Sequence, residues 1–519
     1  MIQGTASHAG KGTLVAGLCR ILADRGFRVA PFKSQNMSLN SFVTESGEEI
    51  ARAQAFQAFA SRTPITADMN PILLKPKGDM TSQVVFHGKP LRDLAAKDYW
   101  REFALTTGFE GVKQSFERLS KEFEVIIIEG AGSPAEINLY EFDIANMKVA
   151  DLADAQVILV ADIERGGSFA SIVGTMALLK PEHKARVRGF VLNKFRGEKE
   201  LLNPGPEIIQ QMTGVPILGV LPYIENLRLP EEDSISLQHM TSDKTKPVTV
   251  AVVRLPRISN FTDFEPLQVN PRVNVIYAHY REDLAGADLV ILPGTKNTVR
   301  DLEWLRETGM DSSIRDLSKQ GKPIIGICGG FQMLGKKILD ESGLESGSPR
   351  TVEGLSLLDV ETTFDNYEKV TERVSAVPIG KGVILEGCGG QELAGYEIHM
   401  GTTILGPEAE PAFRIVQRSG KATSSLDGAV DVNGLVLGTY LHGLFDEPPV
   451  RESVVAYLAG KNRISVAARK ESINEVWEKG LNQIVAAVNE NLDVNRILDL
   501  IGCRAKDQPL SALRNKRVS

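Results

Sequence analysis

The sequence predicts a two-domain α/β protein with mostly parallel sheets. Short apolar runs alternate with helical stretches along both halves of the chain, which is typical of α/β layers. The polar stretch 229–247 interrupts this alternation near the middle of the chain. A length of 519 residues provides hydrophobic cores for roughly two to four domains. We therefore expect a first domain over 1–229, a linker over 230–247 and a second domain over 248–450.

Four apolar runs in the first half are expected to be buried strands. They lie at 125–129 (VIIIE), 157–161 (VILVA), 189–193 (GFVLN) and 216–221 (PILGVL). A shorter strand is expected at 29–32. The stretch 48–61 is rich in Ala, Gln and Phe and is predicted to be an amphipathic helix.

The second half begins a new series of strands and helices. Its expected strands are 248–254, 273–277, 289–292, 323–328, 383–386 and 434–440. The final 70 residues are predicted to be helical, so we expect 451–519 to form an extension of the second domain that ends in a basic, solvated tail.

The composition excludes several classes of protein. Hydrophobic residues make up 42% of the chain and charged residues 24%, as in soluble globular proteins. A net charge of -7 does not favour nucleic acid or an anionic membrane as a partner. The four cysteines are scattered, which argues against a zinc site or a disulfide framework. With no long apolar run and no signal-peptide pattern, we expect a cytoplasmic protein.

A glycine-rich loop opens the chain. Residues 4–13 (GTASHAGKGT) follow a short strand and precede an apolar helix, so their backbone N–H groups form an anion site. We expect Gly10, Lys11, Gly12 and Thr13 to bind the phosphates of ATP, with Lys11 reaching the β- and γ-phosphates. Gly10 lies one position later than in the common P-loop, and Gly12 stands where Ser or Thr usually binds Mg²⁺. The alternative is a glycine-rich turn with a surface lysine.

Other polar residues follow buried strands where the rest of a nucleotide site belongs. Glu129 ends the run VIIIE, and a carboxylate at this end of a parallel strand suits a Mg²⁺ ligand. Glu49 is a weaker second candidate for the metal. Asn193 and Lys194 follow another strand and are candidates for contact with the base. The alternatives are a helix-capping role for Glu129 and a plain loop at Asn193.

The second half contains a candidate nucleophile. Cys328 lies between an apolar strand and a helix expected to start near Phe331, within the sequence PIIGICGGFQMLG. The flanking glycines permit a sharp, exposed turn, and the helix N-terminus favours the thiolate. The alternative is a buried structural cysteine.

A thiol nucleophile needs a base and donors for the oxyanion. His442, at the end of the run GLVLGTYLHGLF, is the preferred base. His399, in GYEIHMG, is the second candidate, with acceptor binding or a structural role as its alternatives. Gly294, after a buried strand, and Gly329 are the expected oxyanion donors.

These motifs together resemble the cobyric acid synthases, a cobalamin-pathway family of dethiobiotin-synthetase-like amidotransferases. The stretches that carry the resemblance are PFKSQNMSLN (31–40), EGAGSPAEINL (129–139), NKFRG (193–197), PGTKNT (293–298), the Cys328 turn, YEIHMG and YLHGLF. The resemblance implies an N-terminal P-loop, dethiobiotin-synthetase-like domain and a C-terminal class I glutamine amidotransferase domain.

The resemblance also implies the reaction. Four peripheral carboxylates (b, d, e and g) of a corrinoid, adenosylcobyrinic acid a,c-diamide, are amidated with ATP, Mg²⁺ and glutamine to give adenosylcobyric acid. The sequence departs from the family at Gly12, where Ser is usual. Leu444 occupies the position where many class I glutaminases carry Glu, so we expect a Cys–His dyad.

The acceptor pocket is expected to follow the strand 29–32. Its candidates are Lys33, Ser34, Gln35, Asn36 and Asn40, together with His399. A lysine and several amide or hydroxyl donors suit a polycarboxylate, whereas plain loop capping is the alternative. Two rival functions remain open: cobyrinic acid a,c-diamide synthase, and a P-loop regulatory ATPase with an inactive amidase domain. A homo-oligomer is also left open.

Overall fold

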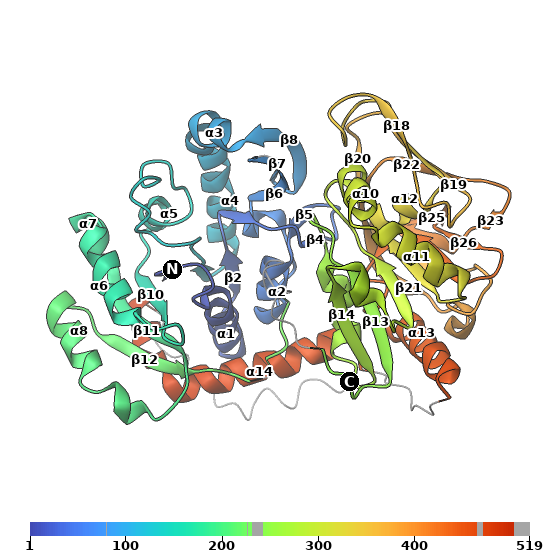
Figure 1. Cartoon of the computed structure of the whole chain (residues 1–519). Coiled ribbons are helices and arrows are strands. Elements are labelled where there is room, and N and C mark those ends of the chain that lie inside the picture. The colour runs from blue at the N-terminus through green and yellow to red at the C-terminus, as the bar shows by residue number, and fades with distance from the viewer. Residues whose placement is uncertain (79, 226, 231–241, 464–470, 503–519) are drawn as a thin grey trace.

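The first half of the chain is built around parallel strands, as Figure 1 shows in blue and green. The computed structural model describes residues 1–78, 80–225, 227–230, 242–463 and 471–502. One sheet has the order β1 (Ile2–Gly4), β10 (Val157–Asp162), β11 (Val187–Phe195) and β12 (Ile217–Pro222). The pair β2 (Val29–Phe32) and β9 (Val125–Ile128) continues it, through a parallel bridge between Ile2 and Glu129. All the strands predicted in this half are confirmed.

Helices cover this sheet on both faces. They are α1 (Lys11–Asp24), α2 (Arg52–Ala60), α4 (Phe109–Glu122), α5 (Met147–Leu152), α6 (Ser168–Leu178), α7 (Pro181–Lys184) and α8 (Gly205–Thr213). Helix α1 is buried along most of its length because its sequence, KGTLVAGLCRILAD, is apolar on nearly every side. It fixes the glycine-rich loop against the centre of the sheet.

Two small sheets lie between the first sheet and the second half, and all their strand pairs are antiparallel except β3 (Gln35–Met37) with β6 (Ile72–Gly78), which is parallel. One contains β3, β6, β7 (Thr81–Phe86) and β8 (Lys89–Ala95), and the other pairs β4 (Ser41–Val43) with β5 (Glu49–Ala51). The helix predicted over 48–61 is therefore wrong at its start. Residues 49–51 pair with β4, and the helix begins only at Arg52.

The second half contains a seven-stranded sheet. Its order is β14 (Val273–Ala278), β13 (Val248–Val253), β15 (Leu289–Leu292), β16 (Ile324–Ile327), β27 (Val436–Thr439), β26 (Ala429–Asp431) and β23 (Ala409–Glu410). The first five strands are parallel. Helices α10 (Thr298–Glu307), α11 (Met310–Lys319) and α12 (Gly329–Leu334) connect them.

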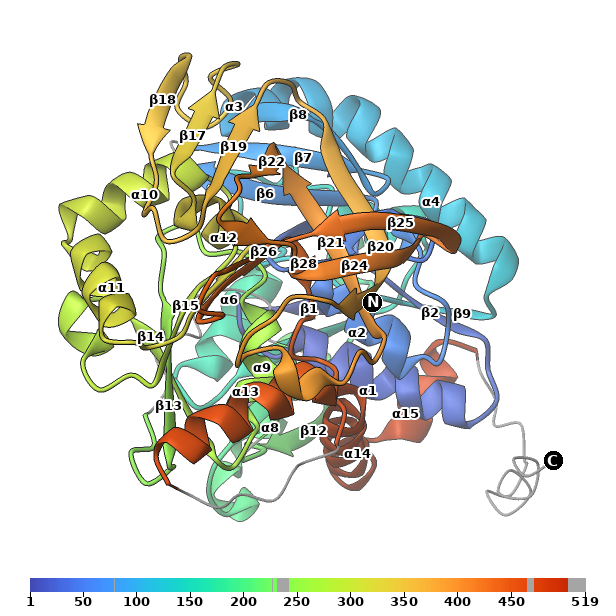
Figure 2. The ribbon, with the colours of Figure 1, turned by 90° about the vertical axis from the view of Figure 1, so that its right-hand side faces the viewer.

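A second layer of mostly antiparallel strands packs beside this sheet, as Figure 2 shows, with β17 (Lys337–Asp340) and β19 (Val360–Phe364) as its parallel pair. One sheet has the order β25 (Lys421–Asp427), β24 (Phe413–Arg418), β20 (Lys369–Pro378), β21 (Leu393–Met400) and β28 (Leu441–His442). Another contains β18 (Arg350–Glu353), β17, β19 and β22 (Thr402–Leu405). The strand predicted at 383–386 is wrong. Its apolar residues Ile384 and Leu385 are buried in a turn between glycines.

The C-terminal helices join the two halves. Helix α13 (Pro448–Lys461) packs on the second half, but α14 (Ile473–Asn491) and α15 (Val494–Leu500) return to the first. Trp477 of α14 packs edge-on against Phe56 and Phe59 of α2, at ring distances of 5.7 and 5.8 Å. The prediction that the whole extension belongs to the second domain is therefore wrong.

Some expectations lie outside the described residues. Most of the expected linker (231–241), Cys503 and the basic end fall in this group. Within the described part of the chain, no helix has both the length and the apolar character needed to span a membrane.

Candidate active sites

The glycine-rich loop has a conformation that depends on glycine. Gly10 has a φ of 95°, and a Cβ there would lie 2.0 Å from Asn193 Nδ2, so only glycine fits. Lys11 starts α1, and its Nζ donates to the carbonyls of Ala6 (3.1 Å) and Gly132 (3.2 Å). The lysine thus lies across the loop, where it can meet a phosphate without a change of backbone.

A cavity of about 450 Å³ adjoins this loop, within the size range of small-molecule sites. Its lining includes the polar side chains of Lys11, Gln57 and Glu129 and the largely apolar ones of Tyr223, Ile224 and Leu227. Gly12, Thr13, Asn193 and Lys194 also line it. Polar and apolar groups on one cavity beside the loop suit the phosphates and the base of a nucleotide.

Asn193 and Lys194 hold the loop from the neighbouring strand. Asn193 Nδ2 donates to the Ala9 carbonyl at 2.9 Å. Lys194 Nζ donates to the His8 carbonyl at 2.7 Å and pairs with Asp162 at 2.8 Å. Contact with the base stays a prediction, but both side chains lie at the cavity.

Glu129 lies where the sequence predicted a metal ligand, at the carboxyl end of β9. It is 2% exposed, and it accepts hydrogen bonds from Lys33 Nζ at 2.9 Å and Gln57 Nε2 at 2.5 Å. A Cβ on Gly12 would lie 3.5 Å from Glu129 Oε2, an ordinary contact, so space does not explain the glycine there. The described residues contain no group of three or more His, Cys, Asp or Glu side chains that could hold a metal. A Mg²⁺ ion here would need phosphate oxygens and water besides Glu129, which is its usual preference.

Glu49 lies elsewhere, in the interface between the two halves. Its carboxylate pairs with Lys75 at 2.6 Å and with Lys369, and accepts a bond from Ser41 Oγ at 2.7 Å. Burial alone would raise the pKa of Glu49, but the two lysines hold it below its usual value. The structure therefore assigns Glu49 to an inter-domain ion cluster, and the expectation of a metal ligand is corrected.

Cys328 has the geometry expected of a nucleophile on a sharp turn. Its φ of 53° and ψ of -113° place a non-glycine residue in a strained conformation between β16 and α12. A Cβ on Gly330 would lie 2.0 Å from the Leu292 carbonyl, so the turn can approach β15 only with glycine. The thiol is 7% exposed and lies 3.4 Å from the Ile398 carbonyl.

His442 forms a triad rather than the expected dyad. Its Nδ1 lies 2.7 Å from Asp263 Oδ2, and both side chains are almost fully buried. Burial disfavours the imidazolium, but Asp263 and hydrogen-bonded Cys328 outweigh it and raise the pKa of His442 to about 10. The prediction of a dyad is wrong because the carboxylate comes from the turn Phe261–Phe264, far from His442 in sequence.

The two expected oxyanion donors lie beside this triad. A Cβ on Gly294 would be 3.4 Å from His442 Cε1, and one on Gly329 would be 2.7 Å from Thr295 Cγ2. Gly329 also begins α12, where backbone N–H groups have no partner within the helix. Their role as oxyanion donors stays a prediction.

His399 lies on the glutaminase side of the molecule. It lines the same small cavity, about 50 Å³, as Cys328, and it stacks on Tyr440 with ring centres 3.7 Å apart. Burial lowers the pKa of His399 to about 3, so the ring is neutral. This position corrects the expectation that His399 faces the acceptor with Lys33 and its neighbours.

The expected acceptor residues are buried and bonded within the protein. Ser34 Oγ donates to the Ile144 carbonyl (2.8 Å), Gln35 Oε1 accepts from Tyr99 (2.5 Å), and Asn36 Nδ2 donates to Gln54 (2.8 Å). The Asn40 carbonyl accepts from the Arg52 amide at 3.0 Å. Their part in acceptor binding stays a prediction.

The segment that contains these residues connects the two sites. At one end, Lys33 pairs with Glu129 in the nucleotide cavity. At the other end, the Ser41 amide donates to Asn260 Oδ1 at 2.9 Å, and Asn260 Nδ2 lies 3.4 Å from the His442 ring nitrogens. Eight positions of chain thus separate Lys33, which pairs with Glu129, from Ser41, which contacts His442 through Asn260.

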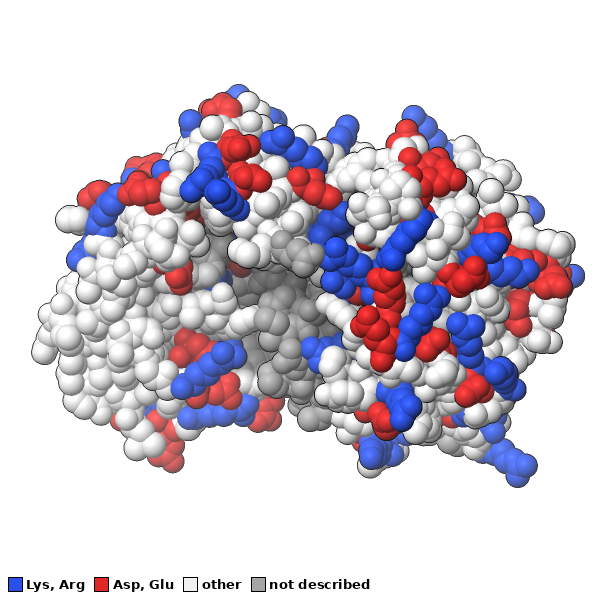
Figure 3. Space-filling view, turned by 45° about the horizontal axis from the view of Figure 1, so that its top comes forward, with Lys and Arg blue, Asp and Glu red and all other residues white. Residues whose placement is uncertain are grey.

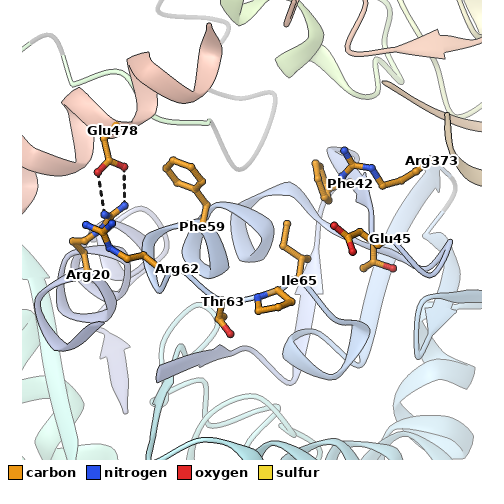
Figure 4. Close-up of a pocket in the computed structure, with 11 residues that line it drawn as sticks. Arg20, Phe42, Glu45, Phe59, Arg62, Thr63, Ile65, Arg373 and Glu478 are labelled. Atoms are coloured by element: carbon orange, nitrogen blue, oxygen red, sulfur yellow. Dashed lines mark hydrogen bonds and ion pairs between the residues drawn. The ribbon is translucent and has the colours of Figure 1, made fainter. Parts of the chain in front are cut away.

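A larger cavity, about 510 Å³, lies apart from both sites (Figure 4). Of its three arginines, Arg20 and Arg62 are paired with Glu478 and Asp24, and Arg373 lies over the ring of Phe42.

Comparisons with known proteins identify the family. A family model described as a CobQ/CobB/MinD/ParA nucleotide binding domain matches residues 1–237, and one described as a CobB/CobQ-like glutamine amidotransferase domain matches 249–450. The chain is 46% identical to a cobyric acid synthase of Pelotomaculum thermopropionicum, over 97% of this chain and 96% of that one. It is 48% identical to a probable cobyric acid synthase of Methanosarcina acetivorans, over 97% and 99%. The chain belongs to the cobyric acid synthase family. As a member of that family it is an enzyme with a nucleotide-binding domain and a glutamine amidotransferase domain.

Within this cobyric acid synthase family member, Asp263 is the residue that sequence reasoning missed. It lies in the run SNFTDFEPL after β13, and no spacing relates it to Cys328 or His442. The one available signal is an acidic residue between the two phenylalanines Phe261 and Phe264.

Asp263→Asn is expected to lower the kcat of glutamine hydrolysis by about 10² to 10⁴-fold, because an amide orients and charges His442 poorly. The carboxylate raises the pKa of His442, so its loss lowers that pKa. The alkaline limb of the activity profile should then move to lower pH. Ammonia release measured from pH 6 to 11 tests this, with the exposed Asp316→Asn as control. An alkaline limb that stays in place would contradict the role of Asp263.

Proposed function

We propose that the protein is a cobyric acid synthase, which amidates the b, d, e and g carboxylates of adenosylcobyrinic acid a,c-diamide to give adenosylcobyric acid. Each amidation would consume one ATP and one glutamine. The observation that carries the proposal is the pair of sites in one chain: a phosphate-binding cavity with Lys11 and Glu129, and a buried Cys328–His442–Asp263 triad.

The first site would activate the acceptor. An acceptor carboxylate oxygen attacks the γ-phosphorus of ATP, ADP leaves, and an acyl phosphate forms. Lys11 would hold the negative charge that develops on the transferred group, and Lys33 would act there through its ion pair with Glu129. Mg²⁺, bound by Glu129 and phosphate oxygens, would neutralise further charge there.

The second site would supply ammonia. The Cys328 thiolate attacks the side-chain amide of glutamine, and His442 gives its proton to the leaving nitrogen. The resulting thioester is hydrolysed by water to glutamate. Asp263 keeps the imidazole oriented and favours its charged form throughout. Ammonia then attacks the acyl phosphate and displaces phosphate.

The acceptor would approach the border between the two halves. On the face in Figure 3, Lys and Arg side chains gather along this border, which suits a substrate with several carboxylates. Ser34, Gln35, Asn36 and Asn40 lie in the segment between the two sites, and they would exchange their bonds within the protein for bonds to the acceptor.

Glu129→Gln is expected to raise the Mg²⁺ concentration needed for half-maximal synthesis by about tenfold or more, because a neutral amide is a weaker ligand for a hard cation. A Mg²⁺ titration of ATP-dependent synthesis measures this, with Glu122→Gln on the exposed end of α4 as control. The same Mg²⁺ dependence in both variants would show that Glu129 is not a ligand of the metal.

An acceptor assay tests the function itself. The purified protein with ATP, Mg²⁺ and glutamine should convert adenosylcobyrinic acid a,c-diamide in four steps, each adding one amide, as mass spectrometry resolves. Preference for cobyrinic acid without the two amides would indicate a cobyrinic acid a,c-diamide synthase instead. ATP hydrolysis with no glutamine hydrolysis would indicate a regulatory ATPase.

A further inference from the structure

The cavity beside Cys328 carries an unusual set of charges. Lys75, Lys296, Lys369 and Glu345 all line it. Glu49 does not line the cavity itself, but it pairs with Lys75 and Lys369. The charges of these two lysines are therefore neutralised in part. Lys296 and Glu345 remain as one positive and one negative group on the same cavity.

Lys296 lacks a carboxylate partner within the described residues. Its Nζ donates to Gln83 Oε1 of β7 at 2.8 Å, a neutral group from the first half of the chain. Removal from water and the nearby Lys369, Lys75 and Lys77 lower the pKa of Lys296. An anion placed in this cavity would favour the charged form of the lysine.

Glu345 is the complementary group. It is 8% exposed, and its Oε2 accepts a hydrogen bond from the Thr298 amide at the start of α10. Burial raises the pKa of Glu345, and the charge of Lys296 lowers it, yet no ion pair joins the two side chains in the described structure. A cation in the cavity would stabilise the carboxylate, as an anion would stabilise Lys296.

We propose that Lys296 binds the α-carboxylate of glutamine and that Glu345 binds its α-ammonium group, which places the side-chain amide against Cys328. The proposal rests on the proposed hydrolysis of glutamine. A free amino acid carries one positive and one negative group on the same carbon, and these match two opposite charges that share a cavity without touching. Because the cavity is about 50 Å³, the side chains that line it must move outward to admit glutamine, which the flexible stems of Lys296 and Glu345 allow.

Amide donors that lack one charge test the assignment. Glutaramate has the carboxylate and the amide of glutamine but no α-ammonium, whereas L-glutaminamide has a neutral carboxamide in place of the α-carboxylate. Ammonia release from each donor gives kcat/KM without the corrinoid. The wild-type protein should prefer glutamine over both analogues by about 10- to 100-fold, since each analogue leaves a charged group unpaired.

Each variant should lose one preference and keep the other. Lys296→Met is expected to reduce the preference for glutamine over L-glutaminamide by about tenfold or more. The preference for glutamine over glutaramate should stay unchanged in this variant. Glu345→Gln should show the opposite pattern. Lys336→Met and Glu303→Gln, at exposed ion pairs with Asp359 and Arg350, are the matched controls and should change neither ratio.

Equal changes in both ratios, or no change in either, would overturn the proposal. The ratios are informative because a general loss of structure lowers kcat/KM for all donors alike and leaves their ratios unchanged. Synthesis from free ammonia and the thermal unfolding temperature show whether each variant is folded. If Lys296→Met does not fold, Lys296→Gln removes the charge with a polar side chain and replaces it. Glutamine hydrolysis without corrinoid amidation would refute the proposed acceptor and leave this test intact. Unchanged ratios with intact synthesis would refute the inference alone.

Discussion

Cys328→Ala is expected to lower the rate of glutamine-driven synthesis by about 10⁴-fold or more and to leave the rate of synthesis from free ammonia unchanged. The thiolate serves only to release ammonia from glutamine. The acyl phosphate would form in the other cavity, beside Lys11 and Glu129, and it accepts ammonia from any source. Activity with ammonium should therefore survive at alkaline pH, where more NH₃ is present.

Two donors and a second cysteine make the test specific. Product formation is measured with glutamine and, separately, with a high concentration of ammonium chloride. Cys388→Ala is the matched control, since Cys388 is also buried but lies in the turn under α13, away from both sites. Glutamine-driven turnover in Cys328→Ala would overturn the proposed mechanism. Loss of the ammonia reaction as well would show that Cys328 is needed for the folded structure rather than for glutamine hydrolysis alone.

Lys11→Ala should give the opposite pattern. The lysine lies across the glycine-rich loop and is placed to meet the phosphates of ATP. Its loss is expected to lower synthesis by about 10³-fold with either glutamine or ammonia, because developing charge on the phosphoryl group loses a preorganised partner. Basal hydrolysis of glutamine should persist, since Lys11 does not line the Cys328 cavity.

The comparison with Lys113→Ala controls for removal of a lysine, because Lys113 lies exposed on α4. Glutaminase activity is followed by glutamate formation, and synthesis by the appearance of the amide product. Near-normal ATP-dependent synthesis in Lys11→Ala would exclude the loop as the phosphate site. A parallel loss of glutaminase activity would show that the two sites depend on each other through the segment from Lys33 to Ser41.

The sequence by itself determined the features that depend on neighbouring residues. The apolar runs of the two parallel sheets, the glycine-rich loop before α1 and the turn at Cys328 are all local patterns. Their geometry follows from side-chain alternation, from glycine at Gly10 and Gly330, and from a strand followed directly by a helix. The strands of both halves could therefore be predicted with few errors.

Only the tertiary structure decided which distant residues meet. Asp263 reaches His442 across 179 positions, and Glu49 lies between lysines of both halves. The same holds for α14, whose apolar face returns to α1 and α2. Such contacts depend on how the layers pack, and no spacing in the chain encodes them. For that reason the sequence could single out Cys328 and His442, but the contact of Asp263 with His442 and the charges around the cavity at Cys328 became visible only in the folded protein.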